Sequence, residues 1–287
     1  MLFSRRARSK RSGFPVLRPR MGNSGLNGKF VCSASLMLLR GAAILLATNA
    51  VWVTTVIAQE QGAPHWSYEG QTSPSHWGDL SSDYAPCKIG HRQSPIDIEA
   101  AQKADLPAIQ FDYKAAPLHI IDNGHTIMIN YAPGSSIKVG DKRYELKQFH
   151  FHRPSEERIK GKRYDMVVHL VHVASDGSTA VVAVLLQQGA DNALIDELWA
   201  DVPKEKNKEG FLDSVQINVA NLLPADRGYY TFAGSLTTPP CTENVTWYVL
   251  KHPVTLSAAE ITEYSKLYRD DARPTQPSYD RAVRESK

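Results

Sequence analysis

The stretch Lys142-Arg-Tyr-Glu-Leu-Lys-Gln-Phe-His-Phe-His152 is the most informative segment of this 287-residue chain. From Gln148 onward, polar and aromatic residues alternate strictly, which is typical of a β-strand whose two faces meet different surroundings. Gln148, His150 and His152 therefore share one face, with neighbouring Cβ atoms about 7 Å apart. Two imidazoles placed in this way can share a metal ion, although a His-x-His pair alone is more often a pair of half-exposed strand histidines.

Further strands are predicted on both sides of this stretch. The segments concerned are rich in Ile, Val, Tyr and Phe, and turn sequences such as Asp-Asn-Gly and Pro-Gly separate them. They are residues 118–121, 125–131, 135–139, 163–173, 179–188 and 245–250. Together with 142–152 they predict a mostly β protein built on a predominantly antiparallel sheet.

Helices are expected to be few and peripheral. They are predicted at residues 192–200, in part of 211–222 and at 257–268, where Ser257 and Glu260 would form a capping box. The preceding segment, 59–116, has no sustained period and is expected to lie over the sheet, pinned by its aromatic side chains. No repeat or linker follows Glu60, so we expect a single domain.

The charge distribution argues against nucleic-acid binding. Of the 33 Lys and Arg residues, nine lie within residues 1–58, and the first acidic residue is Glu60. The remaining 24 basic residues face 30 acidic ones, so the main part of the chain is net negative.

The uncharged apolar run at residues 41–58 ends in small residues, which predicts an export signal. We expect residues 1–58 to be a leader cleaved after Ala58, with residues 1–36 either a disordered tail or an over-extended start. The alternative is an uncleaved membrane anchor, since a helix needs about 18–20 apolar residues to span a bilayer. Export predicts a periplasmic or secreted protein, which would contact a membrane only through an uncleaved leader.

Two of the three cysteines remain after the leader, Cys87 and Cys241. An even pair in an oxidising compartment favours a disulfide between them. Two buried free thiols are the alternative.

A third histidine completes a candidate metal site. In Met166-Val-Val-His-Leu-Val-His172, a predicted strand, His169 and Val171 share one face and His172 lies on the other. Three histidines with one open position are the ligand set of a catalytic zinc site, where the ion lowers the pKa of bound water to about 7. A structural zinc site would have four protein ligands, commonly cysteines.

Polar groups suited to supporting such a site lie nearby in the sequence. The Gln148 carbonyl can accept the free ring N–H of His150 and fix its tautomer. Glu156 could orient a metal-bound hydroxide through an intervening hydroxyl, which the loop Gly234-Ser-Leu-Thr-Thr-Pro-Pro-Cys241 can supply. That loop, taken alone, is more typical of a plain turn between strands.

A set of motifs, in order, resembles the α-class carbonic anhydrases over about residues 64–280. They are Gln93-Ser-Pro-Ile-Asp97, Asn123-Gly-His125, Gln148-Phe-His-Phe-His152, Ser155-Glu156, His169-Leu-Val-His172, Gly234-Ser-Leu-Thr-Thr-Pro-Pro240, Val245-Thr-Trp247 and Arg273-Pro-Thr-Gln-Pro277. Cys87 and Cys241 resemble the disulfide pair of the bacterial, exported branch. The resemblance implies that residues 59–287 form one domain, with a central twisted sheet of about ten strands and a conical cavity ending at Zn²⁺.

The resemblance also implies a role for individual residues. His150, His152 and His169 would be the zinc ligands, and Thr237 would accept the hydroxide's hydrogen bond and donate its own to Glu156. The apolar wall that holds carbon dioxide would comprise Val171, Val181, Leu236, Val245 and Trp247. His125 matches the proton shuttle, which suits a group with an ordinary pKa near 6.5, although a surface histidine is the alternative. Tyr68, Asn123 and Thr238 would complete the polar side.

Three positions depart from the family pattern. Val167 stands where relatives usually have a Glu that accepts the ring N–H of His169. Losing such an acceptor typically costs 10- to 100-fold in affinity or activity, unless a water or a carbonyl substitutes. Glu157 stands where many relatives have His, and Met128 replaces a common polar cavity residue. None of the three removes a ligand.

The implied activity is the reversible hydration of carbon dioxide to bicarbonate and a proton, with sulfonamides and anions as inhibitors. An alternative from a different class is a catalytically silent relative that serves as a zinc-binding or interaction module. The sequence favours the active enzyme over the silent module, because all three ligands are present together with Thr237 and Glu156. A homodimer is left open by the sequence.

Overall fold

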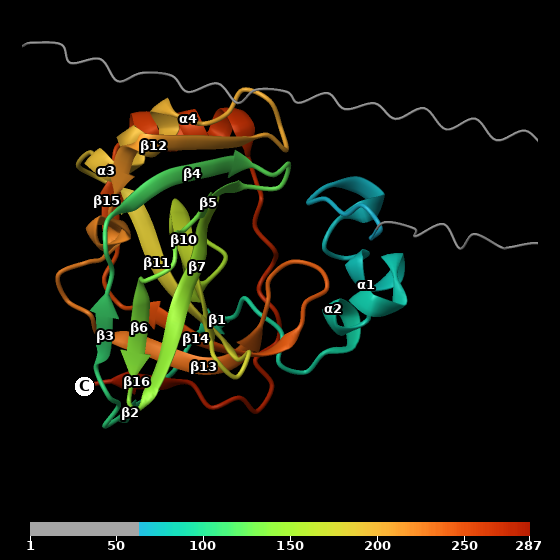
Figure 1. The fold of residues 1–287 in the computed structure, drawn as a ribbon. Helices are drawn as coiled ribbons and strands as arrows, with labels where there is room; N and C mark the ends of the chain where they lie inside the picture. Colours follow the sequence, from blue (N-terminus) through green and yellow to red (C-terminus); the bar gives the residue numbers. More distant parts are fainter. Residues whose placement is uncertain (1–62) are drawn as a thin grey trace, which may run out of the picture. The chain divides into compact units, whose positions relative to one another are not determined.

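A twisted sheet of 13 strands organises residues 63–287, the part of the chain that this computed structural model describes (Figure 1). The strands are β2 (Gln102–Ala104), β3 (Ile109–Asp112), β4 (Ala116–Asp122), β5 (Ile127–Asn130), β6 (Ser136–Val139), β7 (Lys142–His152), β10 (Met166–Ala174), β11 (Thr179–Gln188), β12 (Glu209–Ile217), β13 (Tyr229–Ser235), β14 (Glu243–Leu250), β15 (Val254–Leu256) and β16 (Arg284–Ser286). The main path runs β12-β4-β5-β7-β10-β11-β14-β13-β16-β2, while β6 pairs with β7 and β3, and β15 with β11. The pairs β11–β14, β11–β15 and β16–β2 are parallel, and the other pairs of this sheet are antiparallel. The predicted mostly β, mainly antiparallel fold is confirmed, with a somewhat larger sheet than expected.

Smaller elements surround this sheet. A second sheet of three short strands comprises β1 (Asp97–Ile98), β8 (Arg158–Ile159) and β9 (Lys162–Arg163). The helices are α1 (Trp77–Leu80), α2 (Pro86–Ile89), α3 (Ala193–Ala200) and α4 (Ala258–Leu267), with 3₁₀ turns at Gly70–Thr72, Ser82–Tyr84 and Val219–Leu222. Buried residues of α3 and α4 join the hydrophobic core that lies under β4, and Figure 1 shows both helices beside β4 and β12.

The two faces of the central strands carry different chemistry. Phe149 and Phe151 of β7, with Leu170 of β10, point into the main hydrophobic core. The alternate residues of β7 face the opposite side, where Val167 and Val181 belong to a smaller hydrophobic cluster. The period of two thus directs His150 and His152 away from the main core.

Most predicted elements are confirmed. The strands at 142–152 and 179–188 have the predicted bounds, and the predicted capping box of Ser257 and Glu260 is present at α4. The helix predicted in part of 211–222 is wrong, because Glu209–Ile217 is a strand paired with β4 and only Val219–Leu222 forms a 3₁₀ turn. Pairing at the edge of the sheet outweighs local helix preference here. The predicted leader, residues 1–58, lies outside the described residues.

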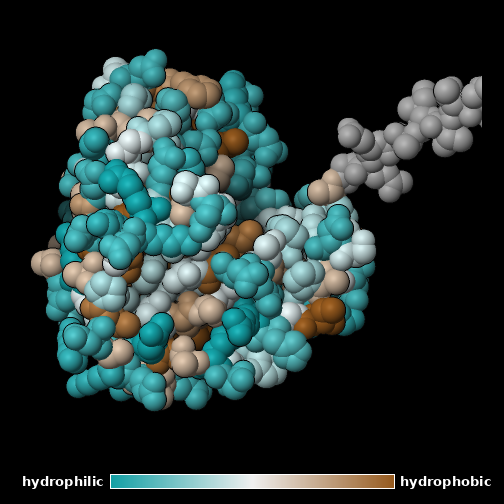
Figure 2. Space-filling model, turned by 60° about the horizontal axis from the view of Figure 1, so that its bottom comes forward, coloured by the Kyte–Doolittle hydropathy of each residue, from teal (hydrophilic) through white to brown (hydrophobic). Residues whose placement is uncertain are grey.

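The surface is mainly hydrophilic on the face shown in Figure 2, where hydrophobic side chains form small separate patches. Among residues 63–287, the large hydrophobic residues that are exposed are Ile89, Phe211, Leu267 and Tyr279. Isolated apolar side chains of this kind are ordinary on protein surfaces. Among residues 63–287 there is no helix with the length and apolar character needed to cross a membrane.

A disulfide anchors the N-terminal segment. Cys87 on α2 is bonded to Cys241, which follows β13. Trp77 and Tyr84 are buried in the same cluster as the two cysteines, so the expected pinning of this segment by aromatic side chains is confirmed. Cys241 also donates its backbone N–H to the Thr238 carbonyl at 2.8 Å. The disulfide therefore braces the loop that contains Thr237 and Thr238.

Replacing both Cys87 and Cys241 by Ser is expected to lower the free energy of unfolding by about 2–5 kcal/mol, because the bond closes a long loop. The sequence separation of the two cysteines is 154 residues. Denaturant unfolding of the double variant and the parent measures the loss. A reducing agent is expected to destabilise the parent and leave the variant unchanged. Equal midpoints for parent and variant would contradict a stabilising role of this bond.

Candidate metal centre

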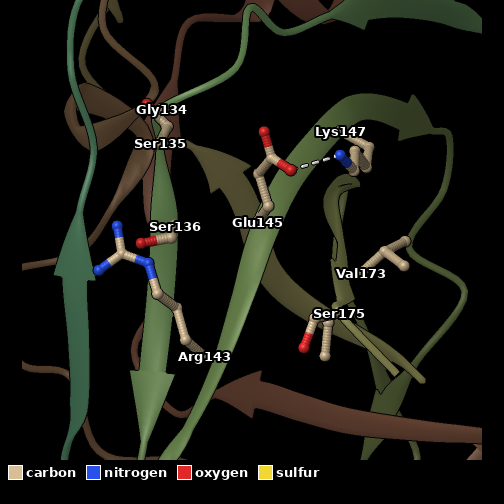
Figure 3. Close-up of a pocket in the computed structure, with 9 residues that line it drawn as sticks. Gly134, Ser135, Ser136, Arg143, Glu145, Lys147, Val173 and Ser175 are labelled. Atoms are coloured by element: carbon tan, nitrogen blue, oxygen red, sulfur yellow. Dashed lines mark hydrogen bonds and ion pairs between the residues drawn. The ribbon is translucent and has the colours of Figure 1, made fainter. Parts of the chain in front are cut away.

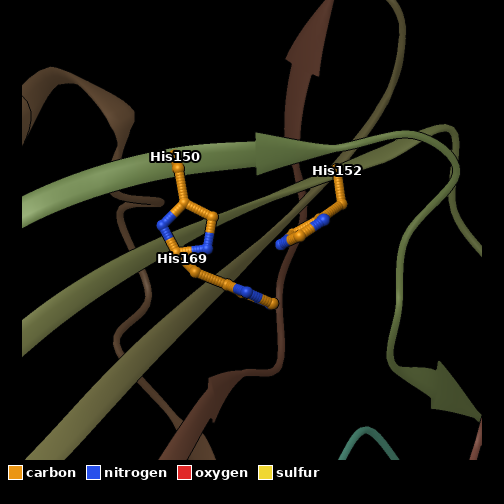
Figure 4. A group of neighbouring side chains, drawn as sticks. All are labelled: His150, His152 and His169. Carbon is orange, nitrogen blue, oxygen red and sulfur yellow. The ribbon is translucent and has the colours of Figure 1, made fainter. Parts of the chain in front are cut away.

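Three histidines from two neighbouring strands converge on one point (Figure 4). The antiparallel register places His169 of β10 opposite His150 of β7, and Val167 opposite His152. One ring nitrogen from each histidine lies within 4.8 Å of the others. The structure thus brings together the three residues that the sequence predicts as ligands.

Each imidazole is oriented by a hydrogen bond from its second nitrogen. His150 Nδ1 lies 2.8 Å from Gln148 Oε1, and His152 Nδ1 lies 2.7 Å from the backbone oxygen of Asp271. His169 Nε2 lies 3.0 Å from Glu157 Oε1. A nitrogen that donates to such an acceptor leaves the other nitrogen with its lone pair, which is the form that binds metals. The nitrogens left facing the common point are therefore Nε2 of His150 and His152 and Nδ1 of His169.

These residues fit a metal ion. His152 Nε2 is buried and has no hydrogen-bond partner among the described residues. A buried polar atom without a partner costs about 1–3 kcal/mol, and a bound cation would satisfy it. Burial also lowers the pKa of His150 to about 3 and that of His152 well below its ordinary value, assisted by the neighbouring imidazoles. Both rings are thus neutral, as ligation requires.

His169 differs electrostatically from the other two ligands. Burial lowers its pKa, but the adjacent Glu157 carboxylate raises it, and the net change is upward. Val167 offers no acceptor to this ring N–H, as expected, and Glu157 in the loop before β8 supplies one instead. Val167 itself is fully buried in the smaller hydrophobic cluster. The sequence pointed to Glu157 as a departure from the family pattern but did not assign it this contact.

Glu156, the preceding residue, lies on the metal-facing side. Its Oε2 lies 3.7 Å from His152 Nε2 and 3.9 Å from His169 Nδ1, while Oε1 accepts the backbone N–H of Arg273 at 2.8 Å. Burial raises the pKa of Glu156 to about 7, against the lowering effects of His169, Thr237 and the Arg273 N–H. Oε2 is buried without a hydrogen-bond partner in the described residues, so it is free to accept one from Thr237.

Two hollows meet at the histidines. The first, of about 210 Å³, is lined by Trp66, Tyr68, Asn123, His125, Thr126, Met128, Gln148, His150, His152 and Thr238. The second, of about 160 Å³, is lined by Gln148, His150, His169, Val171, Val181, Leu236, Thr237, Thr238 and Trp247. We call the first the polar arm, because most of its side chains carry a polar group, and the second the apolar arm, because it contains Val171, Val181, Leu236 and Trp247. The two arms share Gln148, His150 and Thr238. Of the residues predicted to form the apolar wall, Val245 does not line it and is buried in the cluster behind it.

His125 stands in the polar arm on a tight turn. Gly124 adopts a φ of 84°, which glycine tolerates without strain, and Asn123 Oδ1 accepts the backbone N–H groups of His125 and Thr126. The imidazole stacks on Trp66 with ring centroids 3.8 Å apart. Burial, with smaller contributions from His65 and Lys206, lowers the pKa of His125. No local pattern predicts the contact with Trp66, because the two residues are far apart along the chain.

A larger groove, of about 490 Å³, lies elsewhere on the sheet (Figure 3). It contains Arg143, Glu145 and Lys147 of β7, and Lys147 is paired with Glu145. None of the three grouped histidines lines it.

Comparison with known proteins agrees with this geometry. A model of the eukaryotic-type carbonic anhydrase family matches residues 72–287. The chain belongs to this family. It is 43% identical over 246 residues to a carbonic anhydrase of Klebsiella pneumoniae, covering 85% of this chain and 97% of that protein. It is 42% identical over 227 residues to a carbonic anhydrase of Nostoc sp., with coverages of 77% and 86%.

A solved structure supports the same assignment. The α-carbonic anhydrase of Thermovibrio ammonificans, in complex with the inhibitor sulfanilamide, matches with a TM-score of 0.76 and 41% identity, over 79% of this chain and all of that one. The predicted family is thus confirmed, and the protein is a carbonic anhydrase.

In this carbonic anhydrase, His169→Ala is expected to abolish stoichiometric metal binding, because two imidazoles hold a divalent ion far more weakly than three. Elemental analysis of the purified protein measures the metal per chain. His119→Ala is the matched control, since His119 lies on β4 outside the three-histidine group. Full metal content in His169→Ala would show that the ion is held elsewhere.

Proposed function

We propose that this carbonic anhydrase binds Zn²⁺ through His150, His152 and His169 and catalyses the reversible hydration of carbon dioxide to bicarbonate and a proton. The observation that carries this proposal is the convergence of three histidine ring nitrogens at the junction of a polar and an apolar hollow. When bound, zinc with three imidazole ligands lowers the pKa of water to about 7 and so makes a hydroxide-like nucleophile available at neutral pH.

Thr237 and Glu156 orient that nucleophile. Both side chains are buried, Thr237 with 6% of its surface exposed and Glu156 with 1%. The free Oε2 of Glu156 can accept a hydrogen bond from the Thr237 hydroxyl, which leaves the Thr237 oxygen as an acceptor toward the nucleophile. A hydrogen bond in this direction aims the lone pair of the nucleophile into the apolar arm.

The apolar arm holds the substrate. Carbon dioxide is small and has no strong hydrogen-bonding group, so Val171, Val181, Leu236 and Trp247 can hold it without competing for the nucleophile. We propose that the backbone N–H of Thr237 donates to a bound anion. We also propose that sulfonamides inhibit this protein, supported by the Thermovibrio ammonificans relative in complex with sulfanilamide.

His125 is proposed to carry the product proton out of the polar arm. Its ring is partly exposed, and its lowered pKa keeps it neutral near pH 7, so it can accept a proton through water and release it to buffer. Tyr68, Asn123 and Thr238 supply polar groups along this route.

Export is proposed for the whole protein, with residues 1–58 as the leader and 59–287 as the catalytic domain. The apolar run at 41–58 and the disulfide support this, because disulfides persist mainly in oxidising compartments.

Stopped-flow measurement of carbon dioxide hydration by the zinc-loaded protein tests the proposal. Thr237→Val is expected to reduce kcat/KM by about 100-fold, as losses of one transition-state hydrogen bond typically do. Thr242→Val, in the same loop but exposed, is the control and is expected to match the parent. A zinc-loaded parent no faster than His169→Ala would favour the catalytically silent module.

His125→Ala is expected to lower kcat by about 100-fold in dilute buffer and leave kcat/KM unchanged, because proton export follows carbon dioxide attack. In the parent, kcat should rise with pH as His125 loses its proton, with a midpoint below the ordinary 6.5 because burial lowers the pKa of this group. Added imidazole buffer is expected to restore the variant. His252→Ala, an exposed histidine paired with Asp226, is the control. Unchanged kcat in dilute buffer would remove His125 from the proton route.

A further inference from the structure

We propose that Glu157 is the positioning residue of the third ligand: its carboxylate holds His169 in the orientation and tautomer that bind the metal, in place of a carboxylate at position 167. This inference rests on the proposed zinc site but not on turnover.

Among the described residues, the Glu157 carboxylate has His169 as its one partner. His169 Nε2 lies 3.0 Å from Oε1 and 3.3 Å from Oε2, and among the described residues the carboxylate makes no other hydrogen bond or ion pair. Glu157 is fully buried and His169 is 1% exposed. Burial removes the hydration of this carboxylate, so its hydrogen bonds to His169 must offset the cost of desolvation.

Hydrogen bonds of Ser155 hold the loop that carries Glu157 in place. Ser155 Oγ donates to the Glu157 carbonyl at 2.8 Å and accepts the Tyr164 N–H at 2.9 Å, and Ser155 N–H donates to the Tyr164 carbonyl. Arg163 Nε donates to the Ser155 carbonyl at 2.9 Å. The loop that carries Glu157 is therefore tied to the segment leading into β10, the strand of His169.

The loop that carries Glu156 and Glu157 approaches both nitrogens of the His169 ring. Glu156 points toward the metal-facing nitrogens of His152 and His169, whereas Glu157 reaches the far nitrogen of His169. The far-side contact requires Nε2 to carry the proton, which leaves the Nδ1 lone pair for the metal and makes the ring a stronger donor.

Position 167 offers a second place from which a carboxylate could reach His169. Residues 167 and 169 lie two apart on one strand face, with Cβ atoms about 7 Å apart, so a carboxylate at 167 can also reach the His169 ring. Val167 instead packs in the smaller hydrophobic cluster. Exchanging the two side chains, Glu157→Val with Val167→Glu, keeps the same pair of residues and moves only the carboxylate.

Zinc retention, measured as affinity and release rate in competition with a chromogenic chelator, tests the proposal in the full chain. Glu157→Val is expected to weaken zinc binding by about 10- to 100-fold, Glu157→Gln to fall between it and the parent, and the exchanged double variant to recover most of the loss. Glu145→Val, a carboxylate in the separate groove, is the control and should retain zinc normally. Thermal unfolding of each metal-free variant separates a folding defect from a ligand defect.

A second measurement, on Glu157→Gln, tests the proposal even if the Glu157→Val variant does not fold. In zinc-loaded Glu157→Gln, the NMR resonance of the His169 Nε2 proton is expected to move upfield, because an amide oxygen is a weaker acceptor than a carboxylate. Parent-like zinc retention in folded Glu157→Val, an unmoved resonance in Glu157→Gln, or a parent that does not bind zinc would each overturn the proposal. A parent that retains zinc but does not hydrate carbon dioxide would refute the proposed function and leave the role of Glu157 standing.

Discussion

Antiparallel pairing of β7 with β10 is the constraint on which the metal centre depends, because it places His169 directly opposite His150. Phe149 and Phe151 fill the main core from the other face of β7. A slip of one residue would turn the histidines into that core and the phenylalanines toward the cavity. The hydrophobic effect that builds the core therefore also holds the ligands in register.

A buried polar network around Asp271 and Arg273 also holds the groups of the metal centre in place. Asp271 is 1% exposed; its carbonyl meets His152, and its carboxylate accepts the Arg153 N–H and the Tyr264 hydroxyl. Arg273, also 1% exposed, donates to Gln93 and to the carbonyls of Ser94 and Cys87, and burial lowers its pKa to about 10. Charges buried this deeply are tolerated because hydrogen bonds compensate their desolvation. The network joins the N-terminal segment, the disulfide and the C-terminal segment around one centre.

Sequence reasoning predicted the features that depend on local periodicity. The alternation in 142–152 predicted both the strand and the shared face of His150 and His152, and the motifs predicted His169 as the third ligand. It failed where distant segments decide the outcome. Residues 209–217 became a strand through pairing with β4, and the Asp271 carbonyl carries no side-chain signal at all. Glu157 was visible as an unusual residue, but its contact with His169 depends on how a loop folds back against β10.

X-ray absorption spectroscopy of the zinc-loaded protein counts and identifies the atoms bound to the ion, and so tests whether three histidines and one solvent molecule hold it. Three imidazole nitrogens and one solvent oxygen are expected, all at about 2.0–2.2 Å. A fourth protein ligand, or a sulfur scatterer at about 2.3 Å, would contradict an open catalytic position.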